Sequence, residues 1–383
     1  MPEGWFPAHI AKRWSPGHSS PSVSSLFLVE QFHRREKIVR MYFQVVIIGA
    51  GPAGLACARI LCRNGIRTLV VEKKTEIGPK VCAGGLTWGG LADTIPQDLI
   101  ERAFPVQHIY TRFQHTSVSS PSPIIVTVNR KRLGQFMLKQ AIACGAEIMT
   151  STRLHEIGDH RLVLEDIISR RQMQVGFDCL VGADGSLSAV RNFLGLPSTR
   201  MGIGIHYQIP CKKELMEWHL NSSHFKNGYG WIFPHRESVS VGAYADRAVL
   251  PAHALKENLI CWARHQDIDL TAEKCRAEYI SFDYRGWDFG HIFLAGDAAG
   301  LASALTGEGI YPAVVSGEMV ARKIIDPHCD LTRMKKLIQK QKLHCRMLSL
   351  TGKNSLLNIL LSELAVFGLR MGFLNFHQLE MAI

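Results

Sequence analysis

Three glycines at a fixed spacing, Gly49, Gly51 and Gly54, are the clearest chemical signal in this sequence. They follow an apolar run at 45–48 that predicts a buried parallel strand, and Ala53 lies in the helix expected after the turn. The first glycine permits a tight turn, the second lets the backbone approach a pyrophosphate, and the third lets the helix pack against the strand. Free N–H groups and the positive dipole at the helix N-terminus then favour a phosphate anion.

An acid stands where a dinucleotide site needs one. A second apolar run, 68–71, ends at Glu72, 18 residues after Gly54. At this offset a carboxylate accepts hydrogen bonds from ribose hydroxyls, so the sequence predicts a bound dinucleotide rather than a glycine-rich turn without a ligand. Glu72 also disfavours a 2′-phosphate on that ribose, although the neighbouring Lys73 and Lys74 weaken this inference. We place Lys73 among the cofactor-binding residues.

Two later motifs indicate that the bound dinucleotide is a flavin cofactor. Gly182-Ala-Asp184-Gly185 follows an expected strand, and Gly296-Asp297-Ala-Ala-Gly300 follows the apolar run 292–295. A carboxylate at the end of a strand is a suitable acceptor for the hydroxyls of a polyol chain. The alternative for Asp297 is an N-cap of the next helix, a role that can coexist with ligand binding.

In their order, the three motifs resemble those of the p-hydroxybenzoate hydroxylase superfamily of FAD enzymes. The resemblance implies that the first motif holds the ADP pyrophosphate and that Asp297 accepts a hydrogen bond from a ribityl hydroxyl. It also implies that Asp184 and Gly185 lie near FAD, in a motif linked to reduced nicotinamide as well. Arg130 matches an arginine on the phosphate side of the cofactor. FAD is therefore the expected cofactor.

A helix is expected to open after the third motif, near Gly307, Gly309 and Ile310. In the fold of the superfamily that this sequence resembles, the start of this helix places N–H groups and a positive dipole beside the flavin N1 and O2 atoms, where they stabilise anionic reduced flavin. These three residues and Gly296 complete the predicted cofactor-binding set.

Within that superfamily, three segments resemble the geranylgeranyl reductase group: 80–86, 229–234 and 296–310. The first resembles a cysteine-glycine segment that the group places beside the isoalloxazine, and the second resembles its Tyr-x-Trp-x-Phe-Pro signature near the isoprenoid pocket. Ala83 and Ala304 depart from the usual residues of the group. The resemblance spans about residues 41 to 325.

The resemblance assigns roles to four side chains. Cys82 becomes the candidate catalytic residue, and Tyr229, Trp231 and Phe233 become candidate walls of a prenyl pocket. Each has an ordinary alternative, because free cysteines often pack as small hydrophobic residues and alternating aromatic residues often form a strand core.

The predicted fold class is α/β, with a Rossmann-type FAD-binding domain of the p-hydroxybenzoate hydroxylase fold, an antiparallel-sheet substrate domain and a helical C-terminal region. We expect residues 1–40 to be a disordered leader or a start-site extension with Met41 as the functional start, or alternatively an organellar transit peptide. The expected parts are 41–75, 124–200 and 281–330 for the FAD-binding domain, 76–123 and 201–280 for the substrate domain, and 331–383 for the C-terminal region.

Composition and charge exclude several classes of protein. The ten cysteines contain no Cys-x-x-Cys pair, and we expect neither disulfides nor a metal site. The net charge of +11 lies mostly near the ends, which argues against a nucleic-acid-binding face on residues 41–330. No apolar run is long enough to span a membrane, so we expect a cytoplasmic protein.

The C-terminal region suggests a peripheral contact with membranes. Leu331, Met334 and Ile338 begin an apolar stripe at helical spacing, interspersed with lysines and arginines, that could lie on an anionic bilayer. The next segment, 355–369, reads as a buried or interface helix. The alternative is a solvated basic helix followed by a helix packed on the substrate domain.

Together these features predict an FAD-dependent oxidoreductase that saturates carbon–carbon double bonds of an isoprenoid chain or prenylated lipid. A reduced nicotinamide or a ferredoxin-type donor would reduce the flavin, whose N5 would deliver hydride to the alkene. Cys82 would lie near the transfer, directly or through water. The alternatives are a flavin monooxygenase acting on an apolar or aromatic substrate, and a non-catalytic, membrane-associated flavin-binding protein.

Overall fold

The computed structural model describes residues 40–92, 95–352, 354–376 and 380–382. The predicted leader therefore lies outside the described residues, apart from Arg40. The described chain from Arg40 onward is one compact unit.

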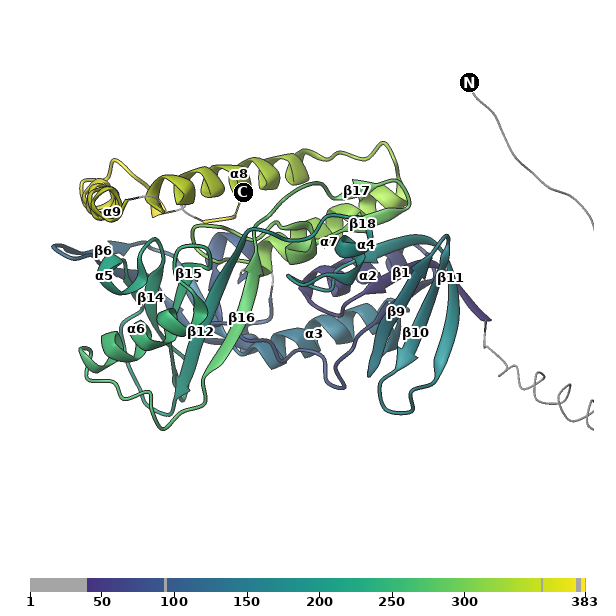
Figure 1. Ribbon diagram of the computed structural model, residues 1–383, viewed down its shortest axis with the longest axis horizontal. Helices are drawn as coiled ribbons and strands as arrows, with labels where there is room; N and C mark the ends of the chain where they lie inside the picture. Colours follow the sequence, from purple (N-terminus) through teal and green to yellow (C-terminus); the bar gives the residue numbers. More distant parts are fainter. Residues whose placement is uncertain (1–39, 93–94, 353, 377–379, 383) are drawn as a thin grey trace, which may run out of the picture. The chain divides into compact units, whose positions relative to one another are not determined.

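The largest sheet carries the three motifs. Its strands run in the order β17-β18-β11-β1-β2-β8, and β10 and β9 extend it from β11 (Figure 1). The central strand β1 pairs in parallel with both β2 and β11, and β11 pairs in parallel with β18. Its strands are β1 Arg40–Ile48, β2 Thr68–Val71, β8 Glu147–Met149, β9 Thr152–Gly158, β10 Arg161–Asp166, β11 Gln172–Gly182, β17 Asp288–Phe289 and β18 Ile292–Leu294.

Apolar β-branched residues explain why β1 and β2 occupy the middle of this sheet. The residues from Val45 to Ile48 in β1 and all four residues of β2 are buried, as expected for parallel strands covered by other elements. The helices around them are α2 Pro52–Arg63, α3 Arg130–Ala143, α4 Ala189–Phe193 and α7 Ile310–Ile325, with the short turn η4 Gly296–Ala299.

Two glycines allow the close packing of α2. A Cβ atom on Gly54 would lie 2.0 Å from the carbonyl oxygen of Gly49, and one on Gly317 of α7 would lie 2.1 Å from that of Ala53. Gly54 therefore has the helix–strand packing role expected from the sequence, and Gly317 brings α7 against the same helix.

The second sheet has the order β16-β12-β15-β14-β13-β5-β6 and is antiparallel except between β13 and β5. The helix α6 Ala252–Arg264 packs on it through Leu255, Leu259 and Trp262. Its strands are β5 Val106–Tyr110, β6 His115–Ser119, β12 Met201–Ile209, β13 Glu217–His219, β14 Tyr229–Pro234, β15 Val239–Asp246 and β16 Arg276–Ser281. The short helix α5 Ser222–Phe225 precedes β14.

A small third sheet, β3-β7-β4, completes the strands of the described residues. It consists of β3 Gly85–Thr87, β4 Ile100–Phe104 and β7 Ile125–Val128, with the short turns η2 Trp88–Ala92 and η3 Gln97–Leu99 between β3 and β4.

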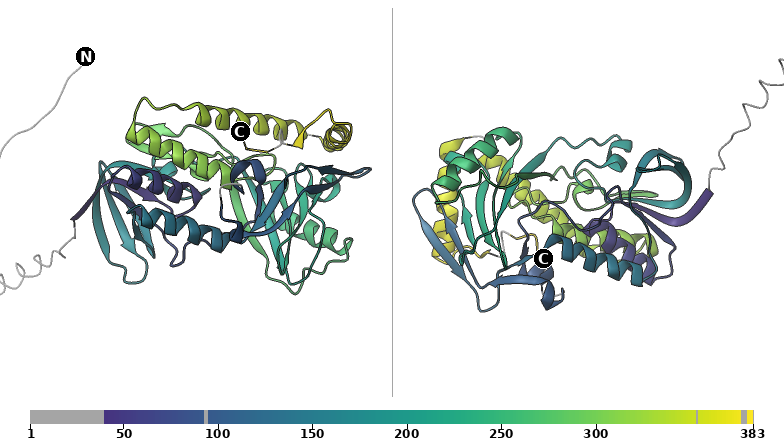
Figure 2. Two further views of the ribbon diagram at one scale, coloured as in Figure 1. Left: turned by 180° about the vertical axis from the view of Figure 1, so that it is seen from behind. Right: turned by 90° about the horizontal axis from the view of Figure 1, so that it is seen from below.

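Two C-terminal helices, α8 Thr332–Thr351 and α9 Ser355–Arg370, lie on one side of the described chain, with α8 running beside α7 (Figures 1 and 2). In the part of the chain that is described, neither these nor any other helix combines the length and apolar character needed to cross a bilayer.

The predicted α/β class with a helical C-terminal region is confirmed. The strands β9, β10 and β11 form an antiparallel meander, and β11 is one continuous strand of 11 residues that ends at Gly182. Gly202 and Gly204 lie in β12, and a Cβ on Gly202 would clash with the Tyr244 ring.

The buried side chain of Arg191 connects α4 to neighbouring segments, and replacing it tests how much these connections stabilise the fold. The side chain is 1% exposed, and its guanidinium donates to the carbonyl oxygens of Leu196, Asp283 and Ala298. We expect Arg191→Met to lower the free energy of unfolding by about 3 kcal/mol, because it leaves buried acceptors unpaired and removes the charge next to Asp283. The measurement is chemical denaturation followed by circular dichroism. Arg161→Met, at an exposed position of β10, is the matched control and should change stability little.

Candidate functional site

Strand register brings the motifs together. Ile48 of β1 aligns with Val71 of β2 and with Gly182 of β11, and Gly182 aligns with Leu294 of β18. Each is the last residue of its strand, so the residues that follow all emerge along one edge of the sheet. The carboxyl edge of parallel strands is where ligands bind in open α/β sheets.

A first cavity, here the phosphate-side cavity, lies at this edge. It is lined by seven residues of the predicted cofactor set: Gly49, Gly51, Glu72, Lys73, Arg130, Asp184 and Gly185. Glu72 is fixed there by its own carboxylate, because Oε2 accepts from the Ala50 N–H at 2.9 Å and Oε1 accepts from the Lys74 N–H at 3.0 Å. The predicted acid thus lies against the predicted glycine turn.

Asp184 has a structural role that the sequence did not reveal. Its Oδ2 accepts from the Ala189 N–H at 2.7 Å, at the start of α4, while Oδ1 is buried without a partner among the described residues. Removal from water raises the pKa of Asp184. One oxygen therefore holds α4 in place, and the other remains available to a ligand hydroxyl.

Arg130 fits a bound phosphate. The residue begins α3, whose N-cap is Asn129, and it lines both the phosphate-side cavity and the cavity beyond it. Within the described residues, its Nε and Nη1 atoms are buried and have no hydrogen-bond partner. Because a buried guanidinium without an acceptor is costly, these atoms fit the oxygen atoms of a dinucleotide phosphate.

A second cavity, here the flavin-side cavity, adjoins the first. The two share Gly51, Lys80, Arg130 and Gly185 among their lining residues. The flavin-side cavity also holds ten further predicted residues: Ala53, Cys82, Tyr229, Trp231, Phe233, Gly296, Asp297, Gly307, Gly309 and Ile310. Of the predicted site residues, Gly54 lines neither cavity and serves packing.

Asp297 lies in the flavin-side cavity with a cationic partner. Its Oδ2 is 3.4 Å from Lys80 Nζ and accepts from the Ser186 hydroxyl at 3.2 Å. The Asp297 carboxylate raises the pKa of Lys80. Asp297 lies inside the turn η4, whose N-cap is Ala295, so the alternative that Asp297 is itself the N-cap is wrong. The sequence did not single out Lys80 or Ser186.

The helix α7 opens into the same cavity. It begins at Ile310 with Gly309 as its N-cap, and no side chain of the described residues caps this end. The first turn of the helix thus presents backbone N–H groups and a partial positive charge near the lining residues, as expected from the sequence.

Aromatic side chains of β14 form one wall. Trp231 and Phe233 are each 5% exposed, and together with Tyr229 they lie on the strand face that lines the cavity. The Tyr229 hydroxyl donates to the Thr306 carbonyl at 2.6 Å, and Trp231 Nε1 donates to the Ser240 hydroxyl at 3.1 Å. The polar atoms of Tyr229 and Trp231 therefore have hydrogen-bond partners, and the ring faces that border the cavity are apolar.

Cys82 borders the same cavity as the aromatic wall. It is half-buried, lines the flavin-side cavity and accepts a hydrogen bond from the Gly84 N–H at 3.4 Å. The structure brings Cys82, the aromatic wall and the α7 opening around one cavity.

Glu308 was missed as a site residue. It lies between the two predicted glycines of the α7 opening, and the sequence offered no signal beyond this position. Its Oε2 accepts from the Met381 N–H at 2.9 Å, and its Oε1 accepts from the Thr87 hydroxyl at 3.3 Å. Enclosure by the cavity raises the pKa of Glu308 to about 7.

Arg130 should contribute strongly to FAD affinity. We expect Arg130→Met to weaken FAD binding by about ten- to a hundredfold, because one or two charge-assisted hydrogen bonds are lost. The measurement is fluorescence titration of the FAD-free protein with FAD. The control is Arg132→Met in the same helix, since Arg132 pairs with Asp98 at the exposed surface. Equal losses in both variants would contradict this role.

The comparisons with known proteins agree with this geometry. Residues 42–327 match the family described as FAD binding domain. Digeranylgeranylglycerophospholipid reductase 3 of Methanosphaera stadtmanae is 29% identical over 302 residues, covering 73% of this chain and 76% of the relative. The crystal structure of a geranylgeranyl bacteriochlorophyll reductase-like protein from Thermoplasma acidophilum has a TM-score of 0.68 and 20% identity, covering 85% of this chain and 88% of that protein.

The fold is shared more widely. PqsL, a probable FAD-dependent monooxygenase from Pseudomonas aeruginosa, has a TM-score of 0.56 and 17% identity, covering 86% of this chain and 96% of that protein. The family match spans most of the described chain and includes all three motifs, and the resemblance to geranylgeranyl reductases is confirmed among its relatives. The chain therefore belongs to the FAD-binding domain family and is an FAD-dependent oxidoreductase.

Proposed function

We propose that this oxidoreductase reduces carbon–carbon double bonds of an isoprenoid chain or a prenylated lipid. The observation that carries the proposal is the flavin-side cavity, in which an aromatic wall faces the predicted flavin residues. An apolar chain has no charged group for a site to hold, so it must be recognised by the shape of an apolar cavity. Relatives named for reduction of geranylgeranyl chains support this substrate class.

Each end of the site has its own task. Arg130 and Lys73 would hold phosphates, Glu72 would accept from the ribose, and Asp297 would accept from the ribityl chain. The α7 opening, with Gly307 and Gly309, would place its positive end against the flavin ring. Bound FAD supplies a hydride when it has been reduced by a nicotinamide or a ferredoxin-type donor.

The protein's contribution to the reaction is mainly alignment. An isolated alkene develops little charge that fixed side chains can stabilise, so holding it against the hydride source accounts for much of the barrier reduction. Trp231 and Phe233 would hold the chain and exclude water, and Cys82 would contact it near the reacting carbons.

The first test is a reaction followed anaerobically by mass spectrometry. Protein beginning at Met41 is reduced and mixed with geranylgeranyl-bearing lipids. We expect products that gain two hydrogens per double bond, with matching flavin reoxidation. Reoxidation only by oxygen, with a hydroxylated product, would instead establish a monooxygenase, whose fold this chain shares. Bound FAD that no donor couples to any product would indicate a non-catalytic flavin-binding protein.

The Cys82→Ala variant tests whether the thiol of Cys82 contributes to alkene reduction. We expect it to retain FAD and to lose at least tenfold in alkene turnover, because the thiol lies against the reacting chain. The control is Cys261→Ala, which replaces an exposed cysteine of α6. Full turnover in the Cys82→Ala protein would remove Cys82 from the reaction.

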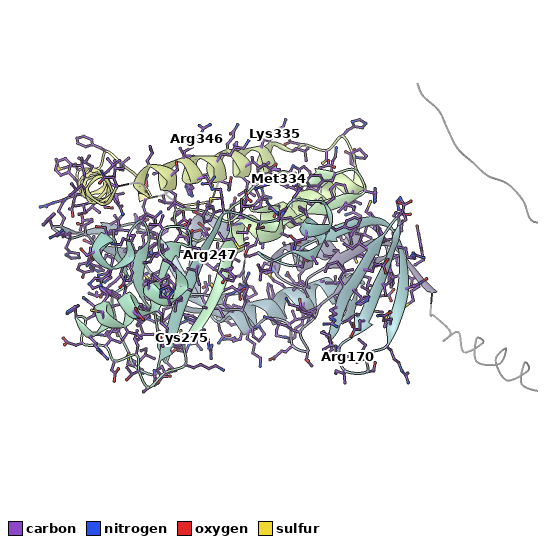
Figure 3. All side chains as sticks on the ribbon, in the orientation of Figure 1. Arg170, Arg247, Cys275, Met334, Lys335 and Arg346 are labelled. Atoms are coloured by element: carbon purple, nitrogen blue, oxygen red, sulfur yellow. The ribbon has the colours of Figure 1, made fainter. Side chains whose placement is uncertain are left out.

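We further propose that the protein meets its lipid at an anionic membrane surface, through α9. The apolar stripe of α8, one of the two candidate bilayer contacts of the C-terminal region, packs on the body of the protein. Met334 and Leu348 are each 1% exposed, and Leu331 and Ile338 pack against the same core cluster as Met334. Figure 3 shows Met334 directed toward α7, whereas Lys335 and Arg346 project away from it.

The free apolar face belongs to α9. Leu356, Leu360, Leu364 and Phe367 recur at helical spacing and are 74%, 54%, 53% and 47% exposed. Exposed cations of the neighbouring α8 supply the charge that an anionic surface attracts: Arg333, Lys335, Lys336, Lys342 and Arg346. An amphipathic helix beside basic residues is the combination that binds bilayer interfaces.

Leu360→Glu combined with Leu364→Glu should reduce binding to anionic vesicles at least tenfold, because each leucine loses its apolar burial. The measurement is vesicle co-sedimentation at two salt concentrations, with neutral vesicles for comparison. Ile168→Glu, 78% exposed in the turn after β10, is the control. Unchanged sedimentation of the double variant would show that α9 does not dock on membranes.

A further inference from the structure

Glu308 has a position in the flavin-side cavity that cofactor binding does not explain. It lies at the opening of α7, and it lines the cavity together with Cys82 and Tyr229. Its carboxyl group is held from two sides, by the Met381 N–H on Oε2 and by the Thr87 hydroxyl near Oε1. A carboxyl group held beside the reacting ligand is a candidate acid or base.

The two hydrogen bonds to the Glu308 carboxyl group differ in length, and this difference determines which oxygen is better placed to carry a proton. Oε2 accepts a backbone N–H at 2.9 Å, so a proton on the carboxyl group is better placed on Oε1. The contact of Oε1 with Thr87 is long, at 3.3 Å. A proton on Oε1 can therefore be shared with Thr87 or given to a ligand in the cavity.

Reduction of an isolated double bond needs both a hydride and a proton. We propose that Glu308 donates this proton to the alkene carbon that does not receive the hydride, an inference that rests on the proposed function. The hydride brings two electrons from the reduced cofactor, the π bond breaks, and two C–H bonds form. The Glu308 carboxyl becomes a carboxylate and takes up a proton from water.

The surroundings of Glu308 keep this proton in place near neutral pH. The pKa of Glu308 is raised to about 7; desolvation is the largest cause of this rise, and the Glu380 carboxylate adds to it. The Met381 N–H, the Thr87 hydroxyl and the Lys340 ammonium on α8 act in the opposite direction. Below this pKa the side chain holds the proton, and above it the proton is lost, so alkene reduction should decline as the pH rises past about 7.

Other protic side chains of the cavity are less suited to the task. The hydroxyls of Tyr229 and Tyr244 donate to main-chain carbonyls of the loop 304–306, and burial raises the pKa of both. Burial lowers the pKa of His206 to about 4, so its cationic form is scarce at neutral pH. Lys80 is engaged in its ion pair with Asp297.

The test compares Glu308→Gln and Glu308→Asp with the unchanged full-length protein, loaded with FAD. We expect Glu308→Gln to lower the maximal rate of alkene reduction by about a hundredfold or more, with a smaller effect on the lipid concentration at half-maximal rate. Chemical reduction of the flavin should be unchanged. Glu308→Asp should restore part of the rate, because it keeps an acid in the cavity. Glu318→Gln, within α7 and outside both cavities, is the matched control.

Two readouts separate proton donation from a structural role. The decline in rate above about pH 7 should disappear in Glu308→Gln. Independently of turnover, infrared titration should show a protonated carboxyl band in the unchanged protein that is lost near pH 7 and is missing in this variant.

The outcomes distinguish the inference from the proposed function. An unchanged protein that reduces the alkene, with a Glu308→Gln variant of equal rate and pH profile, would overturn only the role of Glu308. A variant that loses affinity for the lipid rather than rate would also overturn it. If the unchanged protein reduces no prenyl lipid, the proposed function fails, and this inference fails with it.

Discussion

The alignment of four strand ends is the constraint on which the site depends. Val71, Ile48, Gly182 and Leu294 stand in register across one sheet, although they are far apart in the sequence. A shift of one residue between any two strands would turn side chains to the opposite face and separate the motifs. The buried β-branched runs that fix this register are therefore as necessary to the flavin site as the residues that contact the cofactor.

The two cavities at this edge differ in chemistry. The phosphate-side cavity presents Arg130, whose Nε and Nη1 atoms have no hydrogen-bond partner among the described residues, together with Glu72 and Asp184, as a charged and hydroxylated ligand requires. The flavin-side cavity is bounded by Trp231 and Phe233, whose rings suit an apolar chain. Since Arg130 borders both cavities, one cofactor can occupy the charged part while its reactive ring faces the apolar part.

Much of this could be predicted because the relevant signals are local. Gly49, Gly51 and Glu72 follow short apolar runs that are readily recognised as buried strands, and residues at such strand ends are placed to bind a dinucleotide. Glu308 could not be predicted, because its environment comes from Thr87 and Met381, which are distant in the sequence. The sequence left the contact of the α8 stripe open for a related reason: periodicity shows that a face is apolar but does not show whether a bilayer or the protein covers it.

The electrostatics of the α7 opening connect binding with chemistry. The positive end of the helix favours negative charge on a reduced cofactor, whereas an ionised Glu308 beside it would oppose that charge. The conflict is removed when Glu308 is protonated, a state that its raised pKa of about 7 makes available near neutral pH. Negative charge on the cofactor would strengthen the hold of Glu308 on its proton, and loss of that charge on hydride transfer would weaken it. The acid would thus release its proton most readily when the second alkene carbon needs it, which makes a glutamate at this position compatible with both steps.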